Sequence, residues 1–258
     1  MPENVSRVRL QREWVLCAIA AAASRFVPVP LLDDLIKTRA TRTAVSRTWK
    51  AHGMPDSPAI GILAEDTTGF FTGLVRSALK LPFLLLFYPI RKIVRIVTAV
   101  RGVSADLVDV ILLARSIDRC LRSGWFTGTD PDALARQAEI LRRAHDQMIG
   151  LADVRVLNQA VASALGSVGN LRVYAPAFAR RVFGRSSDAV GSVAPAPEPT
   201  EQEAAVEQSV REIVALFDRP EVASVLADVD RRFDAALAAF TPAGGARGGS
   251  GGGVGGAR

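Results

Sequence analysis

The sequence predicts an all-α fold: a multi-helix bundle followed by a linker and a C-terminal helical pair. Apolar residues make up 49% of the 258-residue chain, so most of it has the composition of a folded protein. Ala, Leu and Val carry this apolar content and aromatic residues only 6%, and Ala and Leu are strong helix formers. The alternation of β-branched and aromatic residues with polar ones, which marks strands, is rare. Prolines and glycines then divide the chain into helices.

The first helix is expected from about Val8 to Arg25. Its apolar run, Trp14–Ala23, follows several arginines and ends in Ala21, Ala22 and Ala23, a pattern that resembles a secretory signal with its small-residue cleavage site. However, Glu3 and Glu13 interrupt the basic region that such a signal requires, and Arg25 follows the run directly. We therefore favour a first helix of the bundle over a signal segment.

A second helix is expected over residues 31–52, after a Pro-x-Pro stretch. Each proline biases the residue before it away from helical backbone, and Pro30 suits the first helical position. Gly53 stands just after the helix, where the left-handed backbone of glycine is favoured. Residues 54–66 are expected to form a loop.

The middle of the chain is divided by Pro82, Pro89 and Gly102. We expect a third helix over 67–81, then an apolar stretch over 83–100 that Pro89 interrupts. After Gly102, Ser104 is suited to cap a helix that ends at Gly124. The break at Gly102 would leave the apolar stretch and this helix as separate elements.

Three more helices are expected before the linker. Asp130 followed by Pro131 is typical of a capping residue and first helical residue, and the helix should run to about Ile149. A further helix is expected over 152–165 and a short one over 177–183. These elements complete a basic helical bundle over residues 1–185.

Beyond residue 185 the composition changes. Residues 186–199 are rich in Pro, Ala and Ser and are expected to form a semi-stiff linker. Residues 200–240 are expected to form an acidic amphipathic helical pair, whose helices are capped by Thr200 with Glu203 and by Asp218 with Glu221. The Gly-rich residues 241–258 are expected to be a disordered tail.

The helical pair carries an apolar stripe that two short helices cannot bury by themselves. The pair must therefore pack on the body of the chain, on a protein partner or on another copy. The candidate docking residues are Val210, Ile213, Phe217, Val225, Val229 and Phe233.

Charge is unevenly distributed along the chain. Residues 1–185 hold 26 Lys and Arg against 15 Asp and Glu, whereas residues 186–258 hold 6 against 11. A basic body with an acidic tail indicates an anionic partner, or docking of the tail on the body. Cys17 and Cys120, isolated within apolar helical patterns, are expected to be buried thiols in a reducing compartment.

Residues 67–101 contain six basic residues and no acidic one. The uninterrupted apolar run between them, Leu81–Ile90, is shorter than the about 20 residues that cross a bilayer. One interpretation is a helix in the headgroup plane of an anionic membrane. The alternative is a buried core helix whose arginines pair with acids such as Asp106, Asp109 and Asp118. The candidate lipid-surface residues are Arg76, Lys80, Phe83, Leu84, Phe87, Arg91, Lys92, Arg95 and Arg101.

The segment Ser24–Ile36, with a Pro-x-Pro followed by two leucines and two aspartates, resembles the opening of EcsC-like helical proteins. It is also similar to helical domains of unknown function, some attached to membrane-associated bacterial GTPases. The resemblance covers about residues 14–53 and extends loosely to 124. It implies a bacterial helical protein near a membrane and supplies no catalytic residues. The sequence lacks the long Gly/Ala-rich hydrophobic hairpin that would insert into a membrane.

No catalytic, cofactor-binding or metal-binding residues are predicted. His52 and His145 have no His or Cys at ligand spacing, and His52 suits a helix C-terminus. Asp33 and Asp34 diverge by about 100° on a helix, which favours a solvated first turn over an acid–base pair. Glycine-rich phosphate-binding motifs and nucleic-acid-binding motifs are also missing from the sequence.

The sequence therefore predicts a non-enzymatic helical protein, cytoplasmic and peripheral on an inner membrane. It would bind anionic lipid through 67–101, with an unknown protein partner or a second copy as further partners. The alternative is a soluble helical adaptor or scaffold in which 83–100 is a buried core helix. Nucleic-acid binding by the basic body is the least favoured interpretation.

Overall fold

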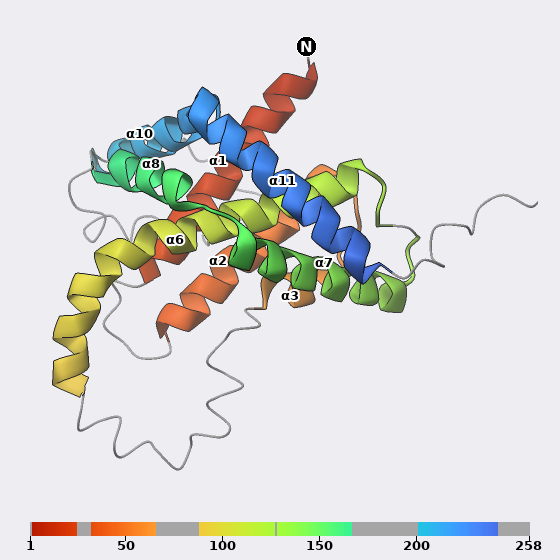
Figure 1. Cartoon of the computed structure of the whole chain (residues 1–258), viewed down its shortest axis with the longest axis horizontal. Helices are drawn as coiled ribbons and strands as arrows, with labels where there is room; N and C mark the ends of the chain where they lie inside the picture. The colour runs from red at the N-terminus through yellow and green to blue at the C-terminus, as the bar shows by residue number, and fades with distance from the viewer. Residues whose placement is uncertain (1, 25–31, 66–87, 127, 167–200, 242–258) are drawn as a thin grey trace, which may run out of the picture.

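The computed structural model describes residues 2–24, 32–65, 88–126, 128–166 and 201–241, and within these ranges it contains eight α-helices and no strand (Figure 1). The all-α prediction is thereby confirmed. The helices are α1 (Pro2–Ala23), α2 (Leu32–Ala51), α3 (Ala59–Ala64), α6 (Tyr88–Arg122), α7 (Pro131–Leu151), α8 (Arg155–Gly166), α10 (Glu201–Leu216) and α11 (Pro220–Phe240).

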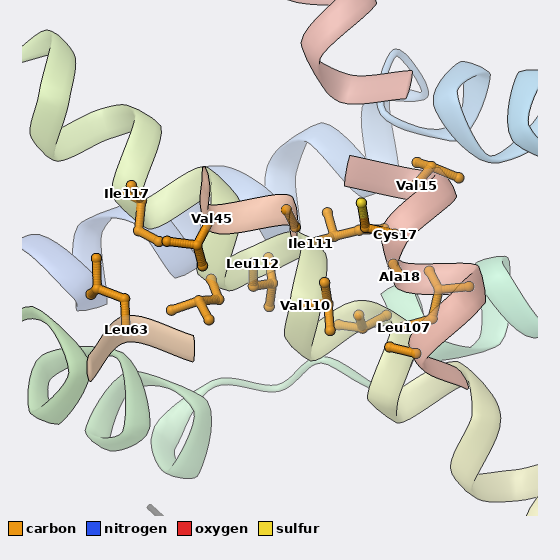
Figure 2. Packing of buried hydrophobic residues seen from close by; sticks show 14 of the residues in the cluster. Val15, Cys17, Ala18, Val45, Leu63, Leu107, Val110, Ile111, Leu112 and Ile117 are labelled. Carbon is orange, nitrogen blue, oxygen red and sulfur yellow. The ribbon is translucent and has the colours of Figure 1, made fainter. Parts of the chain in front are cut away.

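The centre of the core is the second half of α6, which packs against α1 and α2. This part of α6 buries a broad apolar face against its neighbours, while its charged residues lie toward the edges of the contact. Figure 2 shows its side chains interdigitating with those of α1 and α2, and with Leu63 of α3 nearby. The labelled residues of α6 are Leu107, Val110, Ile111, Leu112 and Ile117.

The apolar run Trp14–Ala23 of α1 is buried along its whole length, with no residue more than 3% exposed. It lies against α2 and α6 and also contacts α10. Trp14 Nε1 donates a hydrogen bond to the buried Thr48 Oγ1 at 2.8 Å, and Arg47 pairs with Glu13. The run is thus one of the central packing surfaces of the bundle.

The remaining helices cover this centre. Helix α7 packs against α3 and α11, and α8 packs against α6, α10 and α11. The C-terminal helical pair packs on the preceding helices: α10 on α1 and α8, and α11 on α7 and α8. Figure 1 shows α11 (blue) lying along this side of the bundle.

Local signals account for several helix ends. The Asp130 carboxylate accepts hydrogen bonds from the backbone N–H groups of Asp132 and Ala133, with Pro131 as the first helical residue, as predicted. Gly53 and Gly124 have φ angles of 70° and 68°, a left-handed backbone that glycine adopts without steric cost. Each glycine is the second residue of the turn that ends its helix, α2 or α6.

The structure corrects the predicted break at Gly102. Helix α6 runs continuously for 35 residues through Gly102, and Ser104 lies within it, 6% exposed, rather than capping a new helix. A glycine inside a helix costs only about 1 kcal/mol relative to alanine. Burial of Val103 and Leu107, which follow Gly102 on α6, outweighs that cost.

Two further predictions are wrong in the described part. The expected loop over 54–66 contains α3, which is too short for its sequence period to be recognised. The expected cap at Asp218 is displaced, because Pro220 forces the preceding Arg219 into extended backbone (φ −72°, ψ 134°). Arg219 is therefore the N-cap of α11, and its side chain makes no capping hydrogen bond.

Several expected elements lie outside the described residues. These are the helices over 67–81 and 177–183, the linker 186–199 and the Gly-rich tail from residue 242 onwards.

Candidate functional site

The predicted lipid-surface residues fall in two groups. Arg76, Lys80, Phe83, Leu84 and Phe87 lie outside the described residues. Arg91, Lys92, Arg95 and Arg101 lie in the first half of α6, and the surroundings of their side chains are likewise outside the description. In Figure 1 the start of α6 (yellow) lies clear of the other described helices. The first turns of α6 thus extend beyond the body that the other described helices form.

The six candidate docking residues of the helical pair face the body of the same chain. Val210 and Ile213 are fully buried, and Val229 and Phe233 are 3% and 1% exposed. Phe217 and Val225 are partly buried and pack against the same core. Of the three possibilities left open by the sequence, docking on the body is the one seen in this structure. These side chains therefore stabilise the fold of this chain.

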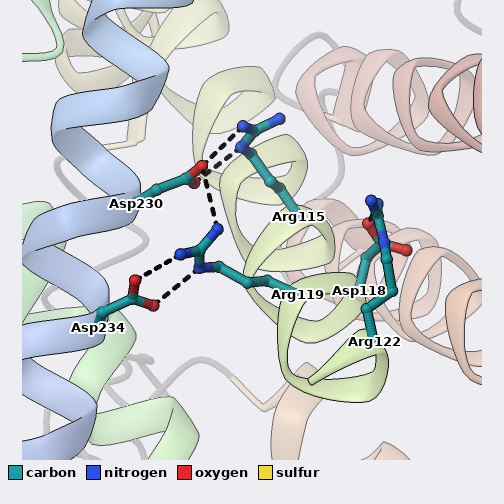
Figure 3. A network of polar contacts seen from close by, with 6 residues as sticks. All are labelled: Arg115, Asp118, Arg119, Arg122, Asp230 and Asp234. Carbon is teal, nitrogen blue, oxygen red and sulfur yellow. Dashed lines mark hydrogen bonds and ion pairs between the residues drawn. The ribbon is translucent and has the colours of Figure 1, made fainter. Parts of the chain in front are cut away.

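Charge complements this apolar docking. Arg115 of α6 donates from Nε and Nη2 to the two carboxylate oxygens of Asp230 of α11, at 2.9 and 2.8 Å. Arg119 binds Asp234 in the same two-pronged way, at 2.8 and 2.5 Å (Figure 3). We call these four residues the α6–α11 ion-pair cluster.

The two ion pairs of the cluster share a contact, and a further ion pair joins the helical pair to the body. Arg119 Nη1 also lies 3.7 Å from an Asp230 oxygen, so one carboxylate touches both guanidinium groups. The hydrogen bond to Asp234 raises the pKa of Arg119 above its usual value. Arg12 of α1 pairs with Glu207 of α10 at 2.6 Å. The acidic helical pair thus docks on the basic body, one of the two outcomes that the charge distribution indicated.

An open cleft of about 530 Å³ lies beside the cluster, between the end of α6, α11 and the start of α1. Four arginines and three aspartates line it, so positive groups are in slight excess. Its lining residues are Arg7, Arg115, Asp118, Arg119, Cys120, Arg122, Ser123, Asp230, Asp234 and Leu237.

The thiol in the cleft is poorly suited to nucleophilic chemistry. Burial raises the pKa of Cys120 to about 12, and burial has the same effect on Cys17 in α1. A thiol attacks as its thiolate, which such a pKa leaves almost unpopulated at neutral pH. Both cysteines are free and buried, as the sequence predicted.

Asp118 joins the end of α2 to the end of α6. Its carboxylate is 4% exposed, accepts a hydrogen bond from His52 Nε2 at 2.8 Å and pairs with Arg122. His52, which the sequence placed at a helix C-terminus, thus has a specific carboxylate partner from another helix. Burial, followed by the positive charge of Arg122, lowers the pKa of His52 below its usual value.

This lowered pKa predicts a pH effect on stability. Because the unfolded chain binds a proton on His52 more readily than the folded chain, His52 destabilises the fold as pH falls below the usual histidine pKa of about 6.5. We expect the free energy of unfolding to decrease from about pH 7 to lower pH, and His52→Gln to reduce that slope. Urea unfolding over this pH range measures it, and identical slopes in both proteins would contradict the assignment.

A second buried polar group lies between α6 and α7. His145 is fully buried, and its Nε2 lies 3.4 Å from Asp109 Oδ1. Burial alone would raise the pKa of Asp109, but the hydrogen bond from His145 and the charges of His145, Arg142 and Lys37 hold it below its usual range. Lys37 in turn lies 3.6 Å from Asp106. These contacts connect α2, α6 and α7 across the core.

The described residues contain no group of three or more His, Cys, Asp or Glu side chains placed to hold a metal ion. Asp33 and Asp34 lie in the first turn of α2, and the surroundings of their side chains are outside the description. None of the described helices combines the length and the apolar character needed to cross a bilayer.

Comparison with protein-family models, with curated proteins and with solved structures gave no match in any of the three.

Proposed function

We propose that this protein is a non-enzymatic helical protein that associates with an anionic lipid surface through residues 67–101. The observation that carries the proposal is the charge pattern of this segment, with six basic residues, no acidic residue and an apolar run between them. Each basic residue near an anionic membrane contributes about 1 kcal/mol to binding. Apolar side chains beside them add the insertion energy of an interfacial helix.

The arrangement of α6 supports this proposal. Its second half is fixed in the core, while its first turns, which lack acidic residues, belong to the same continuous helix. A helix of 35 residues is about 52 Å long. Residues 88–101, which belong to this helix, are held in a defined direction relative to the body, which lowers the entropy that binding to a surface would otherwise cost.

Internal pairing of the acidic residues also supports it. Glu207, Asp230 and Asp234 each bind an arginine of the body. Carboxylates engaged in this way compete less for the basic segment. The resemblance of residues 14–53 to EcsC-like proteins is consistent with a membrane neighbourhood.

Co-sedimentation with phosphatidylglycerol vesicles and with neutral phosphatidylcholine vesicles tests the proposal. The test variant is Arg91→Glu/Lys92→Glu/Arg95→Glu. A matched control reverses the same number of charges at exposed positions of α1, α2 and α7, as Arg9→Glu/Arg42→Glu/Arg136→Glu. Circular dichroism establishes that both variants are folded.

We expect salt-sensitive binding to the anionic vesicles only. The test variant should bind at least about 100-fold more weakly, since three lost contacts of about 1 kcal/mol each already amount to that factor. The control should lose much less. Equal losses in both variants, or no binding by the folded parent protein, would overturn the proposal and favour a helical adaptor.

A further inference from the structure

The cleft beside the α6–α11 ion-pair cluster lies at the opposite end of α6 from the proposed lipid-binding segment. It brings together arginines from two helices, Arg7 of α1 and Arg115, Arg119 and Arg122 of α6. Residues 115, 119 and 122 lie one helical turn apart, so they share one face of α6. A volume of about 530 Å³ lies within the range of small-molecule sites.

The aspartates hold two of these arginines in a fixed orientation. The Asp230 and Asp234 carboxylates bind the Nε and Nη2 groups of Arg115 and Arg119. This two-pronged geometry is the one in which a guanidinium group also binds a phosphate. Each guanidinium carries five N–H donors, of which these bonds use two. Nη1 of Arg119 in addition lies 3.7 Å from Asp230. Figure 3 shows Arg115 and Arg119 stacked along α6 with their guanidinium groups toward α11.

Exposure differs between the two pairs. The side chains of Arg115 and Asp230 are 21% and 17% exposed, whereas those of Arg119 and Asp234 are 45% and 47% exposed. The Arg119–Asp234 pair is therefore hydrated, and an exposed ion pair is weak enough for a competing anion to replace the carboxylate. The Arg115–Asp230 pair is shielded, and Asp230 helps to orient both guanidinium groups.

We propose that this cleft binds an anion of the phosphate class, and that the carboxylate of Asp234 competes with that anion for Arg119. Arg7 and Arg122 line the same cleft, and because Arg122 pairs with Asp118, the excess of one positive charge in the lining corresponds to Arg7. The anion can replace the Asp234 carboxylate on Arg119 without movement of α11, because the apolar face of α11 stays buried through Val229 and Phe233. The bound group would be a phosphate monoester or a diphosphate, from a soluble metabolite or a lipid headgroup.

Calorimetric titration with inorganic pyrophosphate tests the proposal with two single-charge variants of α11. Asp234→Asn removes the competing carboxylate. Asp228→Asn is the matched control, because Asp228 is also partly exposed on α11 and also binds arginines, Arg231 and Arg232, outside the cleft. We expect Asp234→Asn to bind pyrophosphate roughly tenfold more tightly than the parent protein, and Asp228→Asn to bind it like the parent.

A second pair of variants tests the arginines. In the Asp234→Asn protein, Arg7→Gln should weaken pyrophosphate binding several-fold, whereas Arg136→Gln, at an exposed position of α7, should leave it unchanged. The same two substitutions in the parent protein provide the comparison should Asp234→Asn impair folding. Equal affinities for Asp234→Asn and Asp228→Asn, or equal effects of the two arginine substitutions, would overturn the proposal.

Vesicles distinguish the source of the anion. Once pyrophosphate has established the site, Asp234→Asn is tested for binding to phosphatidic acid vesicles in the Arg91→Glu/Lys92→Glu/Arg95→Glu background. A gain over the matched Asp228→Asn protein assigns the site to lipid headgroups. Vesicle binding equal in the two proteins, with the pyrophosphate gain retained, assigns it to a soluble phosphate. Since the pyrophosphate arm does not involve residues 67–101, its outcome is independent of the proposed membrane binding.

Discussion

Replacing Phe233 with alanine should lower the free energy of unfolding of the whole chain by about 3–5 kcal/mol. Phe233 lies on α11, is 1% exposed and belongs to the same core cluster as α6 and α1. Its removal leaves a cavity between α11 and the body that surrounding helices cannot fill without moving. The expected loss is a large part of the stability of an ordinary domain.

Urea unfolding followed by circular dichroism measures this effect. The matched control is Phe240→Ala, because Phe240 is the last residue of α11 and is 39% exposed. The control should change the stability by less than about 1 kcal/mol. Because α11 is part of the core, Phe233→Ala should shift a single cooperative transition. A separate early transition, with the main one unmoved, would show that the helical pair is an independent unit.

Replacing Trp49 with alanine should have an effect of similar size, about 3–5 kcal/mol. Trp49 is fully buried near the end of α2. Its Nε1 donates a hydrogen bond to the carbonyl of Pro55 at 2.8 Å, and its ring meets that of Phe126 edge-on, with centroids 4.8 Å apart. The side chain thus joins α2, the turn after it and the segment between α6 and α7.

Trp49→Phe separates the two contributions. It keeps an aromatic ring but removes the hydrogen bond to Pro55, which leaves that carbonyl without this donor. We expect a smaller loss, about 1–3 kcal/mol. Chemical denaturation of both variants measures the difference. A Trp49→Ala protein as stable as Trp49→Phe would mean that the ring packing contributes little.

Local sequence signals predicted the helices where a single residue decides the backbone. Asp130 with Pro131 fixes the start of α7, and Gly53 fixes the end of α2, because each acts on the backbone next to it. The same reasoning was wrong at Gly102. There the local preference of glycine is weaker than the burial of the apolar residues that follow on α6. Short-range preferences therefore predict helix ends well only where no tertiary contact opposes them.

The ion-pair cluster shows a different limit. Arg115 and Asp230 are separated by 115 positions, and so are Arg119 and Asp234. The two arginines are four residues apart, and so are the two aspartates. This equal spacing is a sequence signal that could have indicated two ion pairs between parallel stretches of helix. The overall charge imbalance indicated tail-on-body docking, but only the packing of α11 on α7 and α8 sets which residues meet.

The most direct test of the membrane proposal is a fluorescent label within the proposed contact segment. Cys17 and Cys120 are buried, with pKa values raised to about 12, so a thiol-reactive, polarity-sensitive dye should attach to an introduced cysteine. Ile93→Cys places the dye among Arg91, Lys92 and Arg95. Arg136→Cys places it at an exposed position of α7 as the control.

We predict a blue shift of the dye at position 93 when phosphatidylglycerol vesicles are added, and none with neutral vesicles. About 1 M salt should abolish the shift, because it reduces the screening length to about 3 Å. The dye at position 136 should not respond. An unchanged spectrum at position 93, or an equal shift at both positions, would contradict lipid binding through this segment.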